Sequence, residues 1–252
     1  MLAVNAKLNL PLVTLEILVY FNSLVKKSIL SERYAVNIIE IELRYEVLDA
    51  ESLKLFVAPL ELLHKKNDVD IYLDTPNASF YQRGLYFRVR NNKKFEIKFN
   101  RACLEDPKLP RQDFCEEHCF SLPLQACDLT RLNDLLLSLA LTPIYNADLE
   151  TLKEANNLVG LYTVDKIRTS YRCENFTLAV DEVAGLGMFL EIELMAQSTE
   201  GIEAIKQEMQ CTLAGLKIKP SKVGYDTLQM KKTNYQQYLR GRFVSELEPL
   251  AG

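Results

Sequence analysis

The feature that most constrains this fold is a set of short stretches in which charged and apolar residues alternate. In Glu40-Ile41-Glu42-Leu43-Arg44-Tyr45, the three charged residues share one face of an extended strand and the apolar residues share the other. The same device returns five more times, at Arg88 and Arg90, Glu96 and Lys98, Lys166 and Arg168, Asp181, and Glu191 and Glu193.

Any one of these stretches is typical of a half-exposed antiparallel strand whose polar face is merely solvated. Together they indicate more, because carboxylates gather on the first and last strands and Arg and Lys on the middle ones. If the charged faces converge, they form a polar lumen with an acidic and a basic side. Such a lumen suits a divalent cation bridged to a polyphosphate.

Length and charge limit the alternatives. A chain of 252 residues allows one large domain or two small ones, and 48% hydrophobic with 25% charged residues is typical of a soluble globular protein. The net charge of −4 gives no electrostatic footprint for a nucleic-acid partner. Any basic patch must therefore be local.

Cysteine and histidine usage excludes several chemistries. None of the six cysteines forms a CxxC pair, and Cys115 and Cys119 stand four apart on or near a strand, too far for a disulfide or a shared metal. Reduced thiols of this kind predict a cytoplasmic protein. The two histidines, His64 and His118, are too few for a zinc site or a Ser-His-Asp triad.

The chain divides into an N-terminal helical extension (1–36), a main domain (37–242) and a C-terminal tail (243–252). The apolar run from Leu8 to Val25 is interrupted by polar residues, so it does not reach the ~20 consecutive apolar residues of a membrane span. No basic segment precedes it and no small-residue cleavage site is evident, so a signal peptide is not expected. We expect a helix here that packs on the domain; a partner-binding or membrane-surface helix is the alternative.

Within the main domain the patterns predict eight strands, near 38–48, 70–76, 85–90, 94–99, 112–121, 161–171, 176–182 and 187–195. A helix capped by Asp49 is expected to run to Leu63, with a kink or break at Pro59, and to close at His64-Lys65-Lys66. Further helices are predicted over 129–141, capped by Asp128; after a Thr199 cap through Leu213; and over 221–242.

Six segments in this order resemble the CYTH family, the triphosphate tunnel metalloenzymes that include class IV adenylyl cyclases and thiamine triphosphatases. The segments span about 36–230 and are Glu40-x-Glu42-x-Arg44, Asp70-Ile-Tyr-Leu-Asp-Thr-Pro76, Gly84-Leu-Tyr-Phe-Arg-Val-Arg90, Phe95-Glu-Ile-Lys98, Val180-Asp-Glu-Val-Ala-Gly-Leu-Gly-Met-Phe-Leu-Glu-Ile-Glu193 and Ser221-Lys-Val-Gly-Tyr225. The resemblance implies an α+β fold: an eight-stranded antiparallel β-barrel, or tunnel, with a charged lumen and helices packed outside. A barrel of about eight strands just holds one small ligand.

The resemblance also implies a set of site residues. The Mg²⁺ or Mn²⁺ ligands would be Glu40, Glu42, Glu191 and Glu193, with Asp181 nearby. The triphosphate would be held by Arg44, Arg88, Arg90, Lys98, Lys166, Arg168 and, more weakly matched, Lys222. Arg44, Lys98 and Asp181 are the catalytic candidates, and Glu117 matches a frequent acidic position. Members of the family are often dimers, so the resemblance also allows a homodimer.

One residue departs from the family pattern, because Arg44 stands where the family has lysine. Arginine can bind phosphate there but cannot give up a proton. Three functions therefore stay open. The first is metal-dependent hydrolysis of inorganic triphosphate or a small organic triphosphate, the second is a class IV adenylyl cyclase that makes cyclic AMP and pyrophosphate from ATP, and the third is a polyphosphate- or nucleotide-binding module without turnover.

Overall fold

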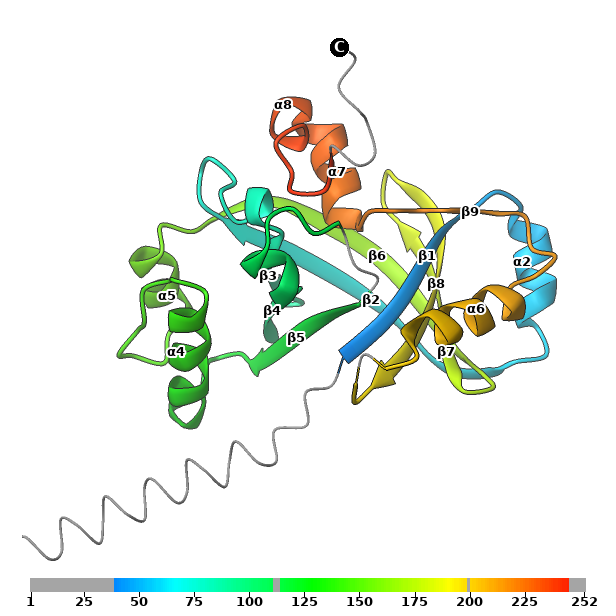
Figure 1. The fold of residues 1–252 in the computed structure, drawn as a ribbon, viewed down its shortest axis with the longest axis horizontal. Helices are drawn as coiled ribbons and strands as arrows, with labels where there is room; N and C mark the ends of the chain where they lie inside the picture. The colour runs from blue at the N-terminus through cyan, green and yellow to red at the C-terminus, as the bar shows by residue number, and fades with distance from the viewer. Residues whose placement is uncertain (1–38, 111–113, 199, 245–252) are drawn as a thin grey trace, which may run out of the picture. The chain divides into compact units, whose positions relative to one another are not determined.

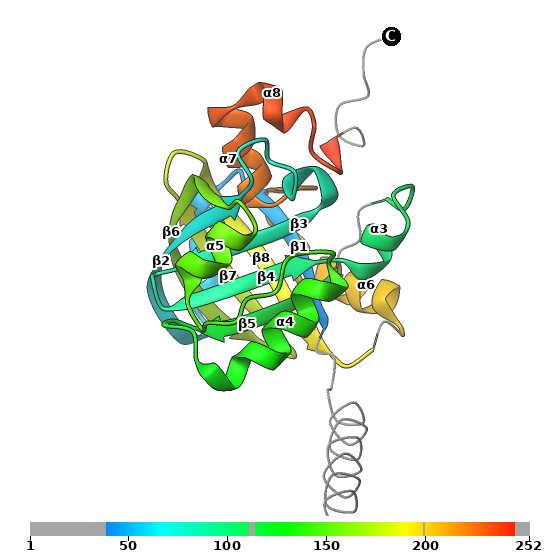
Figure 2. The same ribbon diagram turned by 90° about the vertical axis from the view of Figure 1, so that its left-hand side faces the viewer.

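The computed structural model describes residues 39–110, 114–198 and 200–244, and these form one closed ring of antiparallel strands with helices outside (Figures 1 and 2). The strands are β1 (Ile39–Val47), β2 (Glu61–Asp74), β3 (Leu85–Arg90), β4 (Lys94–Phe99), β5 (Phe114–Ser121), β6 (Val159–Cys173), β7 (Phe176–Val183), β8 (Gly187–Ala196) and the short β9 (Ile218–Pro220). The helices are α2 (Ala50–Val57), α3 (Arg101–Glu105), α4 (Leu129–Ser138), α5 (Leu149–Ala155), α6 (Ile202–Thr212), α7 (Tyr225–Thr233) and α8 (Tyr235–Tyr238), with short 3₁₀ turns at Tyr81–Arg83 and Ala126–Asp128.

Ring closure depends on β1, which pairs with three neighbours. The sheet runs β5-β4-β3-β2-β6-β7-β8-β1, and the start of β1 returns to β5 through pairs such as Glu40 with Cys115. The end of β1 pairs with β9 through Tyr45–Pro220 and its neighbours. The predicted eight-stranded antiparallel fold is confirmed, with β9 as an addition to the ring.

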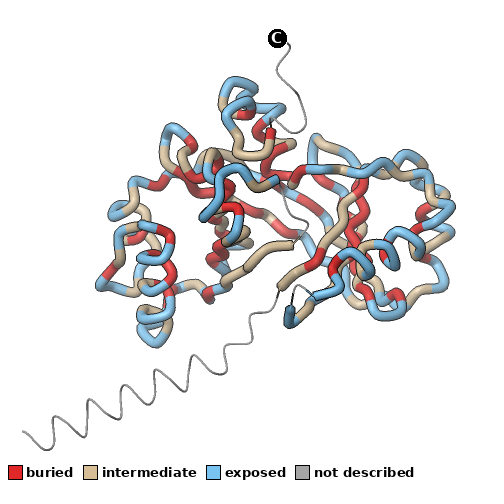
Figure 3. Tube along the Cα trace, viewed as in Figure 1, coloured by how far each residue is buried: buried red, intermediate tan, exposed pale blue. Residues whose placement is uncertain are grey.

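The alternating pattern produces the ring because its apolar residues face outward into helices while its charges face inward. Figure 3 shows buried residues following the strands and exposed ones along the outer helices. A tight turn of three residues (91–93) joins β3 to β4, and Asn91 and Asn92 in it both have positive φ (52° and 54°). Asparagine tolerates this left-handed conformation better than most residues.

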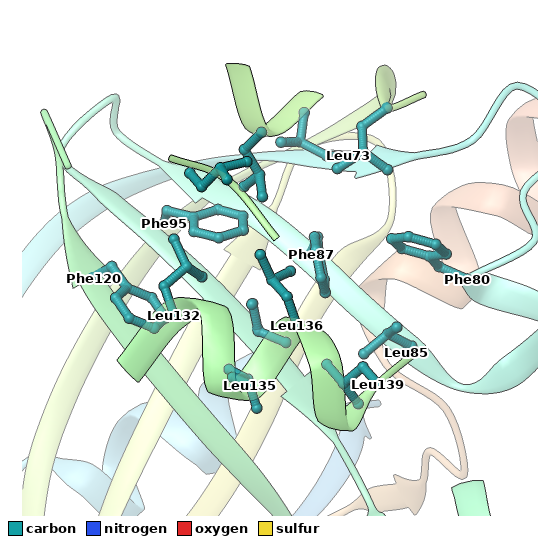
Figure 4. Packing of buried hydrophobic residues seen from close by; sticks show 14 of the residues in the cluster. Leu73, Phe80, Leu85, Phe87, Phe95, Phe120, Leu132, Leu135, Leu136 and Leu139 are labelled. Atoms are coloured by element: carbon teal, nitrogen blue, oxygen red, sulfur yellow. The ribbon is translucent and has the colours of Figure 1, made fainter. Parts of the chain in front are cut away.

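Two apolar layers cover the outside of the ring. The first lies under α4 and α5, where Leu132 and Leu136 pack against Phe87, Phe95 and Phe120 of β3, β4 and β5 (Figure 4). The helix predicted over 129–141 is therefore confirmed, but it ends at Ser138, and Asp128 precedes it without a side-chain capping bond. The second layer packs α2 and α6 against the outer faces of β1, β7 and β8.

Helices α7 and α8 close a third side, where aromatic residues gather. Tyr225 of α7 packs edge-on against Phe189, and Tyr72 stacks on Tyr162 with 5.0 Å between ring centroids. Tyr238 of α8 packs with Tyr81 in an adjoining cluster. No helix of the described residues is long and apolar enough to cross a membrane.

Two helix predictions are wrong. Helix α2, capped by Asp49 as expected, ends at Val57, and the stretch from Glu61 onward, including His64, Lys65 and Lys66, belongs to β2. Pro59 lacks the N–H that would continue the helix, and β6 offers a partner along the whole of β2. The charge pattern of residues 61–66 alone does not show that this segment pairs with β6.

The predicted last helix over 221–242 is two helices that begin only at Tyr225. Asn234 breaks it with non-helical angles (φ −149°, ψ 82°), and its side chain accepts a hydrogen bond from the Gln237 N–H at the start of α8. Residues 1–36 and the Thr199 cap lie outside the described residues; Gly201 precedes α6.

The outward face assigned to β1 can be tested by placing a charge at a buried position of this strand and, as a control, at an exposed position of α2. Ile41 is completely buried under α2 and α6, so Ile41→Asp should lower the free energy of unfolding by at least about 3 kcal/mol, the cost of a buried unpaired charge. Chemical denaturation measures this difference. Leu55→Asp, at a position 76% exposed on α2, should cost less than about 1 kcal/mol. Equal losses in both variants would show that the assigned faces are wrong.

Candidate active site

The inward faces of the strands enclose a cavity of about 200 Å³. This is smaller than the ~300–1,000 Å³ of pockets for drug-sized ligands, so it fits a small ligand or one polar group of a larger one. Its lining among the described residues includes seven carboxylates and six cationic side chains: Glu40, Glu42, Asp70, Glu117, Glu191, Glu193 and Asp226, and Arg44, Arg88, Arg90, Lys98, Lys166 and Arg168.

Strands β1 and β8 together form the acidic wall. Because they are neighbours in the ring, Glu42 stands opposite Glu193 in register and Arg44 opposite Glu191. Burial raises the pKa of Glu193 to about 8, and the nearby charges of Glu191, Glu40 and Glu42 add to this rise while Arg168 opposes it. The wall is thus a group of carboxylates that repel one another.

Strands β2, β3 and β4 supply the opposite wall, which carries both positively and negatively charged side chains. Arg90 makes two parallel hydrogen bonds to Asp70, at 2.7 and 2.8 Å. Arg88 donates to Glu96 at 2.5 Å and to Glu117 at 3.2 Å. Asp70 and Glu96 therefore hold the two guanidinium groups in fixed directions, and the bidentate pair of Arg90 with Asp70 fixes geometry as well as charge.

Lys98 on β4 bridges the two walls. Its ammonium lies 2.5 Å from Glu40, 3.5 Å from Glu42 and 3.8 Å from Glu117. The three carboxylates come from β1 and β5, which meet where the ring closes. Their charges help to raise the pKa of Lys98 well above its usual range, although burial opposes this, so Lys98 is a fixed positive charge.

On β6 and β7, Asp181 lies beneath two cations. Asp181 is fully buried, does not line the cavity, and bonds to Lys166 at 3.1 Å and to Arg168 at 2.6 and 2.8 Å. Arg168 also contacts Glu191, and donates to Glu193 at 3.0 Å. Burial and the neighbouring Arg168 lower the pKa of Lys166. Asp181 therefore acts as an anchor that orients Lys166 and Arg168 toward the cavity.

Arg44 is held by three hydrogen-bond acceptors and one aromatic ring. It contacts Glu42 and Glu191, donates to the carbonyl of Val223 at 3.0 Å, and lies 4.5 Å from the ring centroid of Tyr225. Although burial opposes the charge of Glu191, Arg168 and Arg44 hold the pKa of Glu191 well below its usual range. Arg44 is thus a permanent cation in the middle of the acidic wall.

The donor chemistry of the acidic wall fits a hard divalent cation, which prefers carboxylate oxygens. Side-chain geometry shows a different arrangement: no three His, Cys, Asp or Glu side chains in the described part of the chain converge as metal ligands. Each glutamate of the wall instead contacts Lys98, Arg44 or Arg168. A metal ion would have to take these carboxylates over from their cationic partners.

The structure brings together most of the residues predicted from the sequence. All of them line the cavity except Asp181, which lies behind it, and Lys222, which is exposed and does not contact it. Lys222 lies in the segment before Tyr225, which is not helical although a helix was predicted from residue 221. The Glu117 position also lines the cavity.

Several cavity residues were not predicted, namely Asp70, Tyr72, Tyr86, Asp226 and Phe243. The alternation along β2 and β3 places Asp70, Tyr72, Tyr86 and Arg88 on one inward face, so period two could have found the first three. Nothing in the sequence places Asp226 or Phe243, because both lie after the strands and reach the cavity only through the packing of the C-terminal segment.

Comparison with known proteins agrees with this geometry. Residues 38–223 match the CYTH domain, and no curated protein matches the chain. The PH1819 protein of Pyrococcus horikoshii OT3 is a similar solved structure, with 21% identity, a TM-score of 0.53, and 77% of this chain and 99% of that chain covered.

Two other solved structures share the fold. A putative adenylate cyclase from Vibrio parahaemolyticus has 15% identity and a TM-score of 0.51, covering 76% of this chain and 97% of its own. A putative adenylyl cyclase from Hippeastrum, described as having a dominant triphosphatase activity, has 20% identity and a TM-score of 0.52, covering 77% of this chain and 96% of its own.

The anchoring role of Asp181 predicts a large loss of stability on its neutralisation. Asp181→Asn leaves Lys166 and Arg168 buried without their shared carboxylate, and breaking a buried pair in this way costs about 3–5 kcal/mol. The free energy of unfolding from urea titration measures it. Asp134→Asn, on the exposed face of α4, should stay within about 0.5 kcal/mol of wild type. Wild-type stability in Asp181→Asn would remove Asp181 from this role.

Proposed function

Because this chain belongs to the CYTH domain family, we propose that it is a metal-dependent triphosphatase that hydrolyses inorganic triphosphate or a small organic triphosphate within the ring. The observation that supports this most is the convergence of six cationic side chains and the β1–β8 carboxylates on one enclosed cavity. No other described cavity combines both sets of groups. The Hippeastrum protein of the same fold, with its described triphosphatase activity, favours the same reaction.

The charge balance of the cavity supports a requirement for a divalent cation. Its described lining carries seven carboxylates and six cations, and protonation of Glu193, whose pKa is about 8, leaves the two signs equal near neutral pH, so its net charge does not attract a polyphosphate anion. An anion of several charges would enter together with cations that offset the carboxylates. We infer that Glu40, Glu42, Glu191 and Glu193 would hold Mg²⁺ or Mn²⁺; when bound, such an ion neutralises charge on phosphate oxygens.

The cationic residues would then exchange one partner for another. Arg88 now contacts Glu117, Lys98 contacts Glu40 and Arg168 contacts Glu193, and phosphate oxygens would replace these three carboxylates. Glu96, Asp70 and Asp181 would continue to hold Arg88, Arg90 and Arg168. A preorganised set of donors of this kind stabilises charge that develops during phosphoryl transfer without reorganisation.

Water would be the attacking group in this reaction, since positioning and charge stabilisation need no protein nucleophile. Arg44 cannot take the proton from that water, because Glu191 and Glu42 raise its pKa well above an already high value despite its burial. Its contribution is instead a fixed charge at the acidic wall. A slower enzyme than one with lysine at this position is expected.

Two alternatives use the same cavity. A cyclase would position the ribose 3′-hydroxyl of ATP as the attacking group and release pyrophosphate, and the Vibrio protein of the same fold carries the description of an adenylate cyclase. A binding module would hold the polyphosphate without turnover, as the replacement of lysine by Arg44 suggests. The products of the reaction distinguish all three.

The test is incubation of the purified chain with inorganic triphosphate, thiamine triphosphate and ATP, each with Mg²⁺ and with Mn²⁺. We expect orthophosphate release that a chelator abolishes, with phosphate, pyrophosphate and cyclic nucleotide quantified separately. Cyclic nucleotide with pyrophosphate would contradict hydrolysis and support the cyclase. An absence of any product would support the binding module.

Variants of β1 and β8 connect the activity to the carboxylates. Glu42→Gln and Glu191→Gln should each lower metal-dependent kcat at least about 100-fold, the scale of losing one preorganised electrostatic group. Glu46→Gln, on the same strand but exposed and outside the cavity, is the matched control and should retain wild-type activity. Full activity in both cavity variants would overturn the metal assignment.

A further inference from the structure

The cavity contains one buried polar group that the described part of the protein does not satisfy. Tyr225, the first residue of α7, is 5% exposed and lines the cavity. Its hydroxyl is one of four buried side-chain polar atoms without a hydrogen-bond partner among the described residues, and it alone belongs to a residue that lines this cavity. A buried hydroxyl without a partner is rare in folded proteins, so its partner is to be sought in a ligand.

The ring of Tyr225 is fixed in place by contacts that do not involve its hydroxyl. Its centroid lies 4.5 Å from the guanidinium carbon of Arg44 and 4.9 Å from the ammonium of Lys166. Cations at such distances are attracted to the face of an aromatic ring. Phe189 packs against the same ring at a steep angle, with 5.0 Å between the two centroids. The ring therefore keeps its position without the hydroxyl, which leaves the hydroxyl available to a ligand.

Arg44 also ties the start of α7 to the acidic wall. One terminal nitrogen, Nη1, donates to the backbone carbonyl of Val223 at 3.0 Å, and the other two nitrogens contact one glutamate each, on β1 and on β8. Val223 stands two residues before Tyr225, so this hydrogen bond holds the segment that leads into the helix. The planar guanidinium spreads its donors in three directions, whereas the ammonium of a lysine has a single nitrogen. Arg44 thus connects Tyr225 to the wall through the backbone as well as through the ring.

The charges around Tyr225 favour an anionic oxygen as the partner of its hydroxyl. Arg44 of β1 and Lys166 of β6 both line the cavity and both lie against the ring. A ligand atom attracted to a place between two positive charges is negatively charged. An anionic oxygen accepts hydrogen bonds, and a phenolic hydroxyl donates one. The cavity of about 200 Å³ has room for a small anion beside these three residues.

We propose that the Tyr225 hydroxyl donates a hydrogen bond to a phosphate oxygen of the bound triphosphate, and that Arg44 positions it for this contact. The inference rests on the proposed function, because the triphosphate is the ligand. Tyr225 is then a substrate-binding residue in addition to the arginines and lysines. Arg44 acts as a positioning residue, a role that needs no proton transfer and that uses the hydrogen bond from its guanidinium to Val223.

The stability of Tyr225→Phe distinguishes a ligand-binding hydroxyl from a structural one. Removing a hydroxyl that bonds to the protein leaves its buried partner unsatisfied and destabilises the fold, whereas removing an unpartnered hydroxyl does not. Phenylalanine keeps the ring and its contacts with Arg44, Lys166 and Phe189. The urea midpoint of Tyr225→Phe should therefore equal or exceed that of the wild-type chain. A clear decrease would reveal a protein partner for the hydroxyl and overturn the inference.

Calorimetric titration of the full chain with a methylene-bridged analogue of inorganic triphosphate tests the contact independently of turnover. With Mg²⁺ present, Tyr225→Phe should bind this analogue at least tenfold more weakly than the wild type, because it loses a hydrogen bond to a charged oxygen. Tyr145→Phe, at a residue 89% exposed, is the matched control and should keep wild-type affinity. Equal affinity of Tyr225→Phe and the wild type would overturn the inference and leave the proposed function standing.

Arg44→Lys tests the positioning in the same titration. Without the guanidinium contact to Val223, the hydroxyl should meet the phosphate oxygen less well, so Tyr225→Phe should weaken binding less than threefold in the Arg44→Lys background. A double-mutant cycle of this kind measures the coupling between the two residues. The full tenfold loss in that background would overturn the positioning role of Arg44. A wild-type chain that does not bind the analogue at all would contradict the proposed function itself, so the two failures are distinguishable.

Discussion

The mutual neutralisation of charges inside the ring is the constraint on which the rest of this structure depends. Six cations and seven carboxylates face one enclosed space, and a buried charge is tolerated only when a partner offsets it. Strand register provides the partners: Arg44 stands opposite Glu191, and Lys98 opposite Glu117. Closure of the ring through β1 and β5 completes the pairing by bringing Glu40 to Lys98.

This arrangement explains how one cavity can be stable and still suit a polyanion. Asp70, Glu96 and Asp181 lie deeper than the cations they hold, with exposed fractions of 5% or less, and they fix those cations in direction. The carboxylates of β1 and β8 contact Arg44, Lys98 and Arg168, of which Arg168 is also held by Asp181. Under the proposed function, a metal ion with a triphosphate would offer these groups new partners of the correct sign, so binding would exchange ion pairs rather than break them.

Much of this follows from the sequence, because period two assigns both the strands and their inward faces. The charged pairs predicted on β3, β6 and β8 line the cavity, and so do Glu40, Glu42 and Arg44 of β1, whereas Glu46 continues the same alternation outside it. The sequence does not show which strands pair with each other when they lie far apart in the chain. The first half of β2 is polar and alternates poorly, so only its long partner β6 makes it a strand. Asp226 and Phe243 lie outside every strand, and their place depends on how α7 and the segment after it pack.

The most direct test of this account is the affinity of inorganic triphosphate with and without a divalent cation, measured by titration calorimetry at low ionic strength. If the carboxylates of the cavity must be offset before the anion enters, Mg²⁺ should tighten triphosphate binding at least tenfold relative to a chelator. Equal affinity under both conditions would show that the arginines and lysines bind the anion alone, and it would contradict the exchange of ion pairs on which the account rests.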